Sequence, residues 1–344
     1  MAAVMCISFL LVAIAIQSLL RSARKSGKTF KGTHVVITGG STGIGRSLAE
    51  AFVKTGAHVT IMARTIPKLQ AAVKELKTVS VDSSQKIGFI SVDVTDAKGV
   101  KRAISTCDKV VSVDASSPYV AKCIHILFVQ ELPITYLVTS AGQAWPGYFL
   151  EQDVKTFQKH MDLNYYGTLH AIKAVAPLMT NRREGHIVMI SSAITLAAFL
   201  GYAAYAPSKF AVRALADVLR NELQPFGVKI SIAYPPDTKS PGFDNENKSK
   251  PKECKSIYAL SDTYESEQVA DAILDGIMAG EYHIGSPDFI QNRMINSLTV
   301  GASPRQDWVL DLLLSPIWAL IAEGFRMYAD YQASKYASRL KKSS

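Results

Sequence analysis

A glycine-rich turn between an apolar run and an amphipathic run constrains the fold of this chain more than any other feature. Residues 34–38 (HVVIT) have the composition of a buried strand, residues 45–55 that of a helix, and GGSTGIG joins them with the spacing G-x-x-x-G-x-G. Glycines let the backbone turn tightly and approach a pyrophosphate, while the helix N-terminus presents free N–H groups and the positive end of its dipole. The turn therefore predicts a dinucleotide site. Its cofactor-binding residues are predicted to be Gly39, Ser41, Thr42, Gly43 and Gly45.

The chain continues with short apolar runs alternating with longer amphipathic ones, which is typical of a parallel sheet with crossover helices. No internal repeat or low-complexity linker interrupts residues 32–285, so we expect one α/β domain with a Rossmann-type doubly wound parallel sheet. Strands are predicted at residues 34–38, 58–63, 86–93, 135–139, 186–191 and 228–234. Further helices are predicted from Pro67 and over residues 153–180 and 205–224.

The residue after the second predicted strand distinguishes NAD from NADP. An acidic side chain there binds the ribose 2′-hydroxyl, whereas an arginine accommodates a 2′-phosphate. This chain has Arg64, and Lys68 lies one helical turn further on. We therefore predict NADPH as the cofactor, against the alternative that Arg64 is only a solvated surface residue. Asp93 ends the third predicted strand, where it is expected either to accept a hydrogen bond from the adenine amino group or to cap the next helix.

A Y-x-x-x-K sequence, Tyr205 to Lys209, predicts the chemistry. Positions i and i+4 share one face of a helix, so the ammonium is expected beside the phenol. A neighbouring cation lowers the pKa of a tyrosine from about 10 and makes it a better general acid. The same spacing occurs by chance at Tyr331-x-x-x-Lys335. What distinguishes the first pair is Ser192, which follows the fifth predicted strand, and Asn164 in an upstream helix.

The glycine turn, Ser192, Tyr205, Lys209 and Asn164 together resemble the short-chain dehydrogenase/reductase family over about residues 32–285. The resemblance implies that Tyr205 donates a proton and that Lys209 tunes its pKa and binds the ribose. It also implies that Ser192 polarises the substrate carbonyl and that Asn164 holds a water for proton relay. These four are the predicted catalytic residues.

A second stretch narrows the resemblance to one branch of the family. Residues 234–238 (YPPDT) and 240–243 (SPGF) resemble the 3-ketodihydrosphingosine reductases, where most family members have Pro-Gly in place of Pro236-Asp237. The resemblance implies reduction of a long-chain sphingoid ketone, with Thr238 near the nicotinamide carboxamide. We assign no acid to the amine of that substrate. The alternatives are a membrane-anchored steroid or retinol dehydrogenase and a catalytically silent nucleotide-binding membrane protein.

Two segments depart from the family pattern. The usual Asn-Asn-Ala-Gly-like turn after the fourth strand is replaced by Thr139-Ser140-Ala141-Gly142, which removes an asparagine tied to sheet stability. Residues 96–134 form a longer segment than one helix and turn require. The first departure is expected to change how this corner holds the cofactor. The second is expected to affect contacts between subunits. The sequence does not decide whether the protein forms a homo-oligomer.

The net charge of +9 belongs to the two ends of the chain. The basic residues there are Arg21, Arg24, Lys25, Lys28, Lys31, Lys335, Arg339, Lys341 and Lys342. These nine positive charges equal the net charge of the chain, so residues 32–334 are close to neutral. This pattern predicts contact with anionic membrane lipid and no nucleic-acid partner. The four cysteines form no C-x-x-C pair, so we predict a reducing compartment without a disulfide or a zinc or other metal site.

Both ends are predicted to meet a membrane. Residues 1–20 are uncharged and long enough to cross a bilayer, so residues 1–31 are interpreted as an anchor with a basic flank rather than a cleaved signal peptide. Residues 286–344 are interpreted as an apolar membrane-associated region with a basic tail. Within it, residues 308–322 are apolar but contain Asp311, so they are expected to form an interfacial helix or a cover over the substrate mouth; the alternative is a two-pass hairpin that uses residues 286–306. The ending Lys-Lys-Ser-Ser resembles a dilysine retrieval signal. We therefore expect an endoplasmic-reticulum membrane protein whose catalytic domain faces the cytosol.

Overall fold

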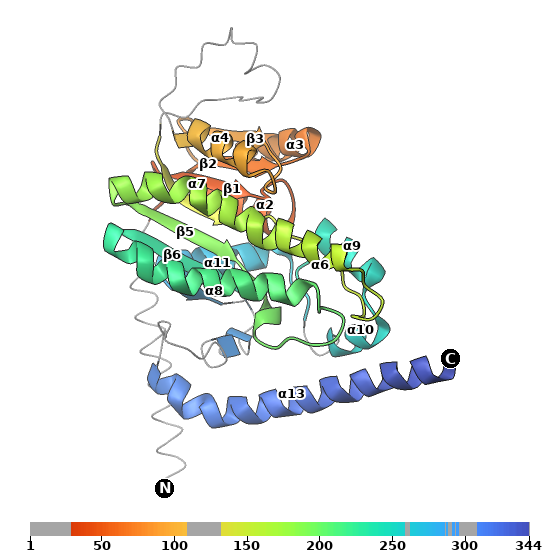
Figure 1. The fold of residues 1–344 in the computed structure, drawn as a ribbon. Helices are drawn as coiled ribbons and strands as arrows, with labels where there is room; N and C mark the ends of the chain where they lie inside the picture. Colours follow the sequence, from red (N-terminus) through yellow and green to blue (C-terminus); the bar gives the residue numbers. More distant parts are fainter. Residues whose placement is uncertain are drawn as a thin grey trace.

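The strands of the chain run parallel in one seven-stranded sheet with the order β3-β2-β1-β4-β5-β6-β7 (Figure 1). The computed structural model describes residues 29–108, 132–258, 262–285, 287, 291–292, 294–295 and 308–343. The strands are β1 (His34–Thr38), β2 (His58–Ala63), β3 (Ile87–Ser91), β4 (Ile134–Thr139), β5 (Gly185–Ile190), β6 (Val228–Ala233) and β7 (His283–Ile284). The strand order reverses between β1 and β4, and such a reversal opens a crevice at the carboxyl ends of the strands.

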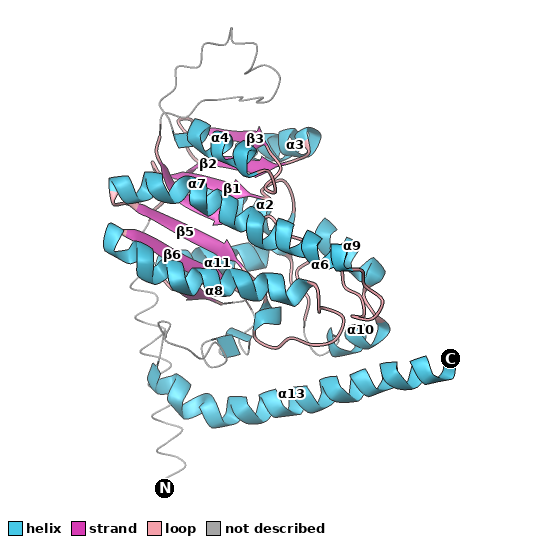
Figure 2. Ribbon diagram, viewed as in Figure 1, coloured by secondary structure: helices cyan, strands magenta, loops and turns pink. Residues whose placement is uncertain are grey.

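Helices cover both faces of the sheet, which explains why the strands are continuous apolar runs rather than alternating ones. The α-helices are α2 (Gly43–Lys54), α3 (Ile66–Thr78), α4 (Ala97–Asp108), α6 (Val154–His160), α7 (Gly167–Arg182), α8 (Tyr205–Leu223), α9 (Pro241–Ser249), α10 (Lys252–Tyr258), α11 (Ser266–Ala279) and α13 (Trp308–Ser343). A π-helical segment, η1 (Met161–Tyr166), and two 3₁₀ turns, η2 (Ala193–Thr195) and η3 (Gln224–Phe226), complete the set. Figure 2 shows α7 and α8 in front of the strands and α11 behind them.

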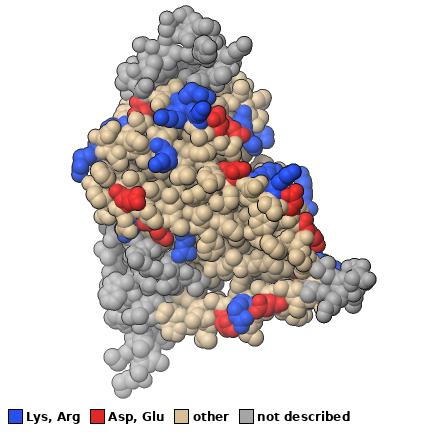
Figure 3. Space-filling model, viewed as in Figure 1, with Lys and Arg blue, Asp and Glu red and all other residues tan. Residues whose placement is uncertain are grey.

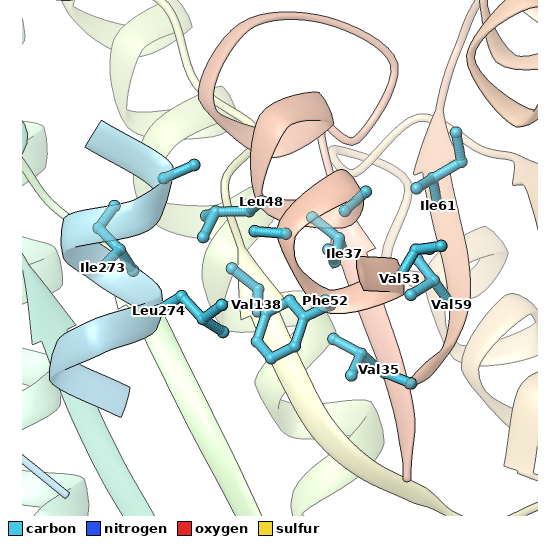
Figure 4. Packing of buried hydrophobic residues seen from close by; sticks show 14 of the residues in the cluster. Val35, Ile37, Leu48, Phe52, Val53, Val59, Ile61, Val138, Ile273 and Leu274 are labelled. Carbon is cyan, nitrogen blue, oxygen red and sulfur yellow. The ribbon is translucent and has the colours of Figure 1, made fainter. Parts of the chain in front are cut away.

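The core behind the sheet fixes the helix that begins at the glycine turn. Leu48, Phe52 and Val53 of α2 are fully buried against β1 and β2, and Ile273 of α11 packs in the same cluster (Figure 4). Truncating a buried phenylalanine such as Phe52 to alanine costs about 3–5 kcal/mol. This packing holds the N-terminus of α2 at the carboxyl edge of β1, where the crevice lies.

The six predicted strands are confirmed, with small differences at their ends. β3 ends at Ser91, so Asp93 lies in the following turn rather than in the strand. β7 was not predicted, because two residues are too few to form a pattern. The single helix predicted over residues 153–180 is divided by the π-helical η1. Pro67 lies in the first turn of α3, as predicted.

The C-terminal region forms one long helix that includes Pro316 and runs along the lower edge of the molecule in Figure 1. Its contacts with the body include those with α10. Among the residues that the structure describes, no helix is both long enough and apolar enough to span a bilayer. The predicted anchor segment, residues 1–20, and residues 109–131 of the long segment lie outside the described residues.

Candidate active site

A crevice of about 370 Å³ at the carboxyl edge of the sheet brings together most of the predicted site residues. Its lining includes Gly39, Ser41, Thr42, Gly43, Gly45, Arg64, Lys68, Ser192, Tyr205, Lys209 and Thr238. Asp93 lines an adjoining cavity together with Arg64, and Asn164 is fully buried. The crevice therefore lies where the reversal of strand order predicts it.

The glycine turn has the shape of a phosphate cradle. Gly39 and Gly43 adopt φ values of 70° and 55°, which side chains disfavour. A Cβ atom on Gly45 would lie 2.5 Å from the carbonyl oxygen of Gly39. The backbone thus approaches itself too closely for any side chain, and the first turn of α2 faces the crevice. These residues fit the pyrophosphate of a dinucleotide, with the N–H groups of the helix N-terminus as donors.

Arg64 and Lys68 lie at the end of the crevice formed by the turn after β2. The Arg64 side chain is 66% exposed, and its Nη1 lies 3.8 Å from Oδ2 of Asp93. The carboxylate of Asp93 already has hydrogen-bond partners in its own turn, because its Oδ1 accepts hydrogen bonds from the backbone N–H and the hydroxyl of Thr95. Two cations at this position fit a 2′-phosphate. The adenine contact of Asp93 stays a prediction.

Tyr205 is the first residue of α8, and its phenol lies in the crevice beside the hydroxyl of Ser192. Burial raises the pKa of the phenol, and the negative charge of Glu246 raises it further, while the nearby Ser192 hydroxyl opposes both. Burial therefore dominates the pKa of this phenol, and the lowering expected from Lys209 stays a prediction.

Lys209 lies one helical turn beyond Tyr205, with Nζ 5.9 Å from the centre of the phenol ring. Its ammonium donates a hydrogen bond of 3.0 Å to the carbonyl oxygen of Ile190, and burial lowers its pKa to about 8. A group with this pKa is mostly cationic at neutral pH. The lysine is thus held at the crevice by the end of β5.

Asn164 anchors the wall of the crevice from the π-helical η1. Its Oδ1 accepts a hydrogen bond from the backbone N–H of Gln143 at 2.9 Å, and its Nδ2 donates to the carbonyl oxygen of Gln143 and to Oγ of Ser208. The side chain therefore ties the turn after β4 to the first part of α8. Its predicted role in holding a relay water stays a prediction.

The corner formed by residues 139–142 is held without the usual asparagine. The backbone N–H groups of Ser140 and Ala141 donate to the carbonyl oxygen and to the hydroxyl of Thr38, respectively. A Cβ on Gly39 would lie 2.7 Å from Cα of Ala141, so the corner packs directly on the glycine turn. The hydroxyl of Thr139 is buried and has no hydrogen-bond partner among the described residues.

Three charged residues beside Tyr205 were not predicted as site residues; we call Asp237, Glu246 and Lys250 the charge cluster. Lys250 Nζ lies 3.2 Å from Glu246 and 3.8 Å from Asp237, and its side chain is only 2% exposed. Burial raises the pKa of Asp237 to about 7. Both carboxylates line the crevice. The sequence signal was the aspartate at a position where the family usually has glycine.

Thr238 follows the charge cluster at the same edge of the crevice. It is buried, and its hydroxyl donates a hydrogen bond of 2.8 Å to the carbonyl oxygen of Pro236. This bond fixes the turn after β6. The predicted contact with a nicotinamide carboxamide stays a prediction.

Comparison with known proteins adds independent information. The sequence model of the family described as short chain dehydrogenase matches residues 33–251, which include the glycine turn and Tyr205. The chain is 35% identical over 310 residues to a 3-ketodihydrosphingosine reductase of Dictyostelium discoideum, covering 87% of each chain. It is 37% identical over 276 residues to a 3-ketodihydrosphingosine reductase of Bos taurus, covering 79% of this chain and 76% of the relative.

Solved structures share the fold. A short-chain dehydrogenase from Sphingobium yanoikuyae in complex with NADPH superimposes with a TM-score of 0.58 at 25% identity, covering 74% of this chain and 87% of the other. A short-chain type dehydrogenase/reductase from Mycobacterium ulcerans gives a TM-score of 0.63 at 24% identity, covering 77% and 91%. The family match and the NADPH complex support a nicotinamide cofactor in the crevice.

Proposed function

Since the chain belongs to the short-chain dehydrogenase family, we propose that it is an NADPH-dependent reductase of 3-ketodihydrosphingosine, forming dihydrosphingosine. One observation carries the proposal: Ser192, Tyr205 and Lys209 meet in the same crevice as the glycine turn. The names of its curated relatives supply the substrate class. The intact set of catalytic side chains argues against a silent nucleotide-binding protein.

Each catalytic residue of the crevice has its own role in the reduction of a ketone. NADPH, when bound at the glycine turn, supplies a hydride to the keto carbon. The Ser192 hydroxyl, which lies in the crevice beside the phenol of Tyr205, is placed to donate a hydrogen bond to the keto oxygen. Tyr205 then gives its proton to that oxygen as the carbonyl double bond is lost. The nearby ammonium of Lys209 stabilises the phenolate that remains.

NADPH is favoured over NADH by the charges at the end of β2. Arg64 and Lys68 both line the crevice there. A 2′-phosphate carries negative charge that two cations pair with directly, whereas the 2′-hydroxyl of NADH gives them no such partner.

The charge cluster favours a substrate with an amine. Two carboxylates face one lysine at the crevice, so the cluster carries one negative charge in excess when all three groups are ionised. The sphingoid ketone has a cationic amine on the carbon next to its keto group, close to where Tyr205 must act. An ammonium there would pair with Asp237 and favour its ionised form. A steroid or retinoid has no amine, so it would leave the excess negative charge of the cluster without a second cation.

The membrane location is part of the proposal. The uncharged residues 1–20, the basic cluster that follows and the Lys-Lys-Ser-Ser ending support an endoplasmic-reticulum membrane protein with a cytosolic catalytic domain. Protease treatment of intact microsomes would digest the catalytic domain in this arrangement. Protection of that domain until detergent is added would contradict it.

A substrate comparison tests the function. Purified full-length protein in detergent is assayed by NADPH oxidation with the sphingoid ketone, the same ketone lacking the amine, and a steroid ketone. We expect the highest kcat/KM with the sphingoid ketone and a lower one without the amine. Efficient turnover of the steroid with none of the sphingoid ketone would overturn the proposal.

A further inference from the structure

Two adjoining cavities lie between α13 and the body of the protein. The first, of about 500 Å³, is lined almost wholly by apolar atoms, with Phe199, Phe210 and Ala333 among its residues. The second, of about 270 Å³, continues along α13. Both are lined by residues 198–200 and by Ala333, so together they form one elongated space that we call the α13 groove.

Small side chains on α13 leave room for the groove. Ala322, Ala329 and Ala333 line it, at spacings that place them on one face of the helix. Phe325 and Tyr336 of α13 also line the groove, whereas Leu320 and Met327 are 76% and 61% exposed and lie outside its lining. In Figure 3 the charged side chains visible on α13 gather mainly in one cluster midway along it, and the surface between that cluster and α8 is uncharged.

The α13 groove borders the catalytic crevice through Tyr202. The ring of Tyr202 lines the groove, while its hydroxyl donates a hydrogen bond of 2.5 Å to Glu246, which lines the crevice. Along the start of α8, Tyr205 faces the crevice and Ala206, the next residue, lines the groove. Tyr202 is buried and separates the two spaces, so a molecule with its polar end at Tyr205 reaches the groove only when this side chain turns aside.

We propose that the α13 groove holds the alkyl chain of the ketone substrate, and that α13 sets the chain length the protein accepts. This inference rests on the proposed function, because a sphingoid ketone joins a polar amino ketone to a long chain. Each buried CH₂ group is worth about 0.8 kcal/mol relative to water. A chain that moves from lipid into the apolar first cavity avoids that cost, whereas a chain left in water pays it in full; the second cavity also includes Arg326 and Asp330 in its lining.

Exposed apolar side chains at the groove support entry from a membrane. Phe149 and Phe210 line the first cavity yet are 67% and 41% exposed. Exposed rings at a cavity mouth are unfavourable in water and favourable at a lipid surface. Ile317 and Leu320 extend the apolar surface along α13. The groove thus opens where a chain leaving the bilayer would enter.

Filling the groove tests the proposal. Ala333→Leu places a larger side chain in both cavities, while Ala319→Leu makes the same change at an exposed position of α13 outside the lining. We expect Ala333→Leu to lower kcat/KM about tenfold for the long-chain amino ketone and less than about twofold for a short-chain analogue. Ala319→Leu should change neither value.

The outcomes separate the two proposals. If the wild-type protein reduces neither ketone, the proposed function fails. If it reduces the long-chain ketone and Ala333→Leu lowers activity on both chain lengths equally, or on neither, the α13 groove is not the chain site. Should Ala333→Leu fail to fold, Ala329→Leu fills the second cavity and is judged by the same ratio of long-chain to short-chain activity.

Discussion

The carboxylate of Asp237 lies at the edge of a buried site and shares the ammonium of Lys250 with a second carboxylate. Its side chain is 14% exposed, Lys250 is 3.8 Å away, and Glu246 competes for that same lysine at 3.2 Å. Burial and the charge of Glu246 raise the pKa of Asp237 to about 7, while Lys250 opposes the shift. At neutral pH the carboxyl is thus only partly ionised, and a cationic substrate gains most from the ionised form.

The binding of an amino ketone should therefore depend on pH through Asp237. Below about pH 7 the carboxyl is protonated and no longer attracts an ammonium, so KM for the sphingoid ketone should rise by up to about tenfold per pH unit. Steady-state kinetics of the wild type and Asp237→Asn would measure this. The variant should show a raised KM without this dependence and unchanged kinetics toward the ketone lacking the amine. Identical pH profiles in the two proteins would contradict the assignment.

Two threonines at the corner beside the glycine turn should respond oppositely to the same substitution. Thr139→Val removes a buried hydroxyl that has no partner in the described part of the chain, so thermal unfolding should be unchanged or shifted upward. Thr38→Val removes the hydroxyl that accepts from the N–H of Ala141 and should destabilise by about 1 kcal/mol. Equal loss of stability in both variants would show that the Thr139 hydroxyl has a partner after all.

The sequence was sufficient to predict that Ser192, Tyr205 and Lys209 meet, but not what surrounds them. Tyr205 and Lys209 share a helix face, so their spacing alone places them together. The charge cluster depends on how α9 folds back against the turn after β6, which no local pattern specifies. The raised pKa of Tyr205 was also not predicted, because it comes mainly from burial, which no local pattern specifies.

Side chains of the site lie where strands end and helices begin. β2 ends beside the crevice, and Arg64 follows it at once. We expect Arg64→Ala to raise KM for NADPH by about 10–100-fold and to leave KM for NADH nearly unchanged, since only NADPH carries the phosphate. Arg102→Ala on α4, also exposed and far from the glycine turn in sequence, serves as the control. Equal changes for both cofactors would show that Arg64 does not contact the phosphate.

The end of α13 is fixed to the body by a small polar and aromatic set. Arg339 forms an ion pair of 3.1 Å with the buried Glu253, and Tyr336 stacks on Tyr148 with ring centres 3.7 Å apart. Both rings also line the α13 groove. The position of the helix, and with it the width of the groove, therefore depends on these contacts.

Loosening that attachment should be visible as faster amide exchange. Glu253→Gln removes the charge that holds Arg339, so amides of α13 should exchange several-fold faster while those of β1 and β4 stay protected. Glu323→Gln breaks an exposed ion pair with Arg326 on the same helix and should have little effect. Hydrogen exchange followed by mass spectrometry compares the three proteins. Unchanged exchange in Glu253→Gln would show that other contacts hold α13.

Helices and strands with long sequence patterns were predicted, whereas elements that depend on tertiary packing were not. The buried strands were found because each is a continuous apolar run between glycine or polar turns. The π-helical η1 has no sequence signature of its own and is recognised only from the backbone around Asn164. β7 is too short for a periodic signal, and it forms because β6 offers a free edge.

At the scale of the whole molecule, a neutral Rossmann-type body carries its crevice on one edge, and the long helix α13 lies nearby. The crevice joins cofactor-binding and proton-donating residues, and the α13 groove lies on the other side of Tyr202. This arrangement suits an amphiphile whose polar end reacts while its chain stays out of water. The sequence predicted an interfacial helix or a cover over the substrate mouth in this region; the structure places α13 beside the groove, and its role at the substrate mouth stays a prediction.

Replacing the proton donor tests this account most directly. Tyr205→Phe keeps the ring and removes the hydroxyl, so reduction of the sphingoid ketone by NADPH should fall by about 10²–10⁴-fold while NADPH binding persists. Tyr331→Phe makes the same change in the exposed Y-x-x-x-K sequence of α13 and should leave the rate unchanged. Single-turnover measurement of NADPH oxidation in both variants gives the answer. A Tyr205→Phe protein that binds NADPH and reduces the ketone at the wild-type rate would contradict the central claim.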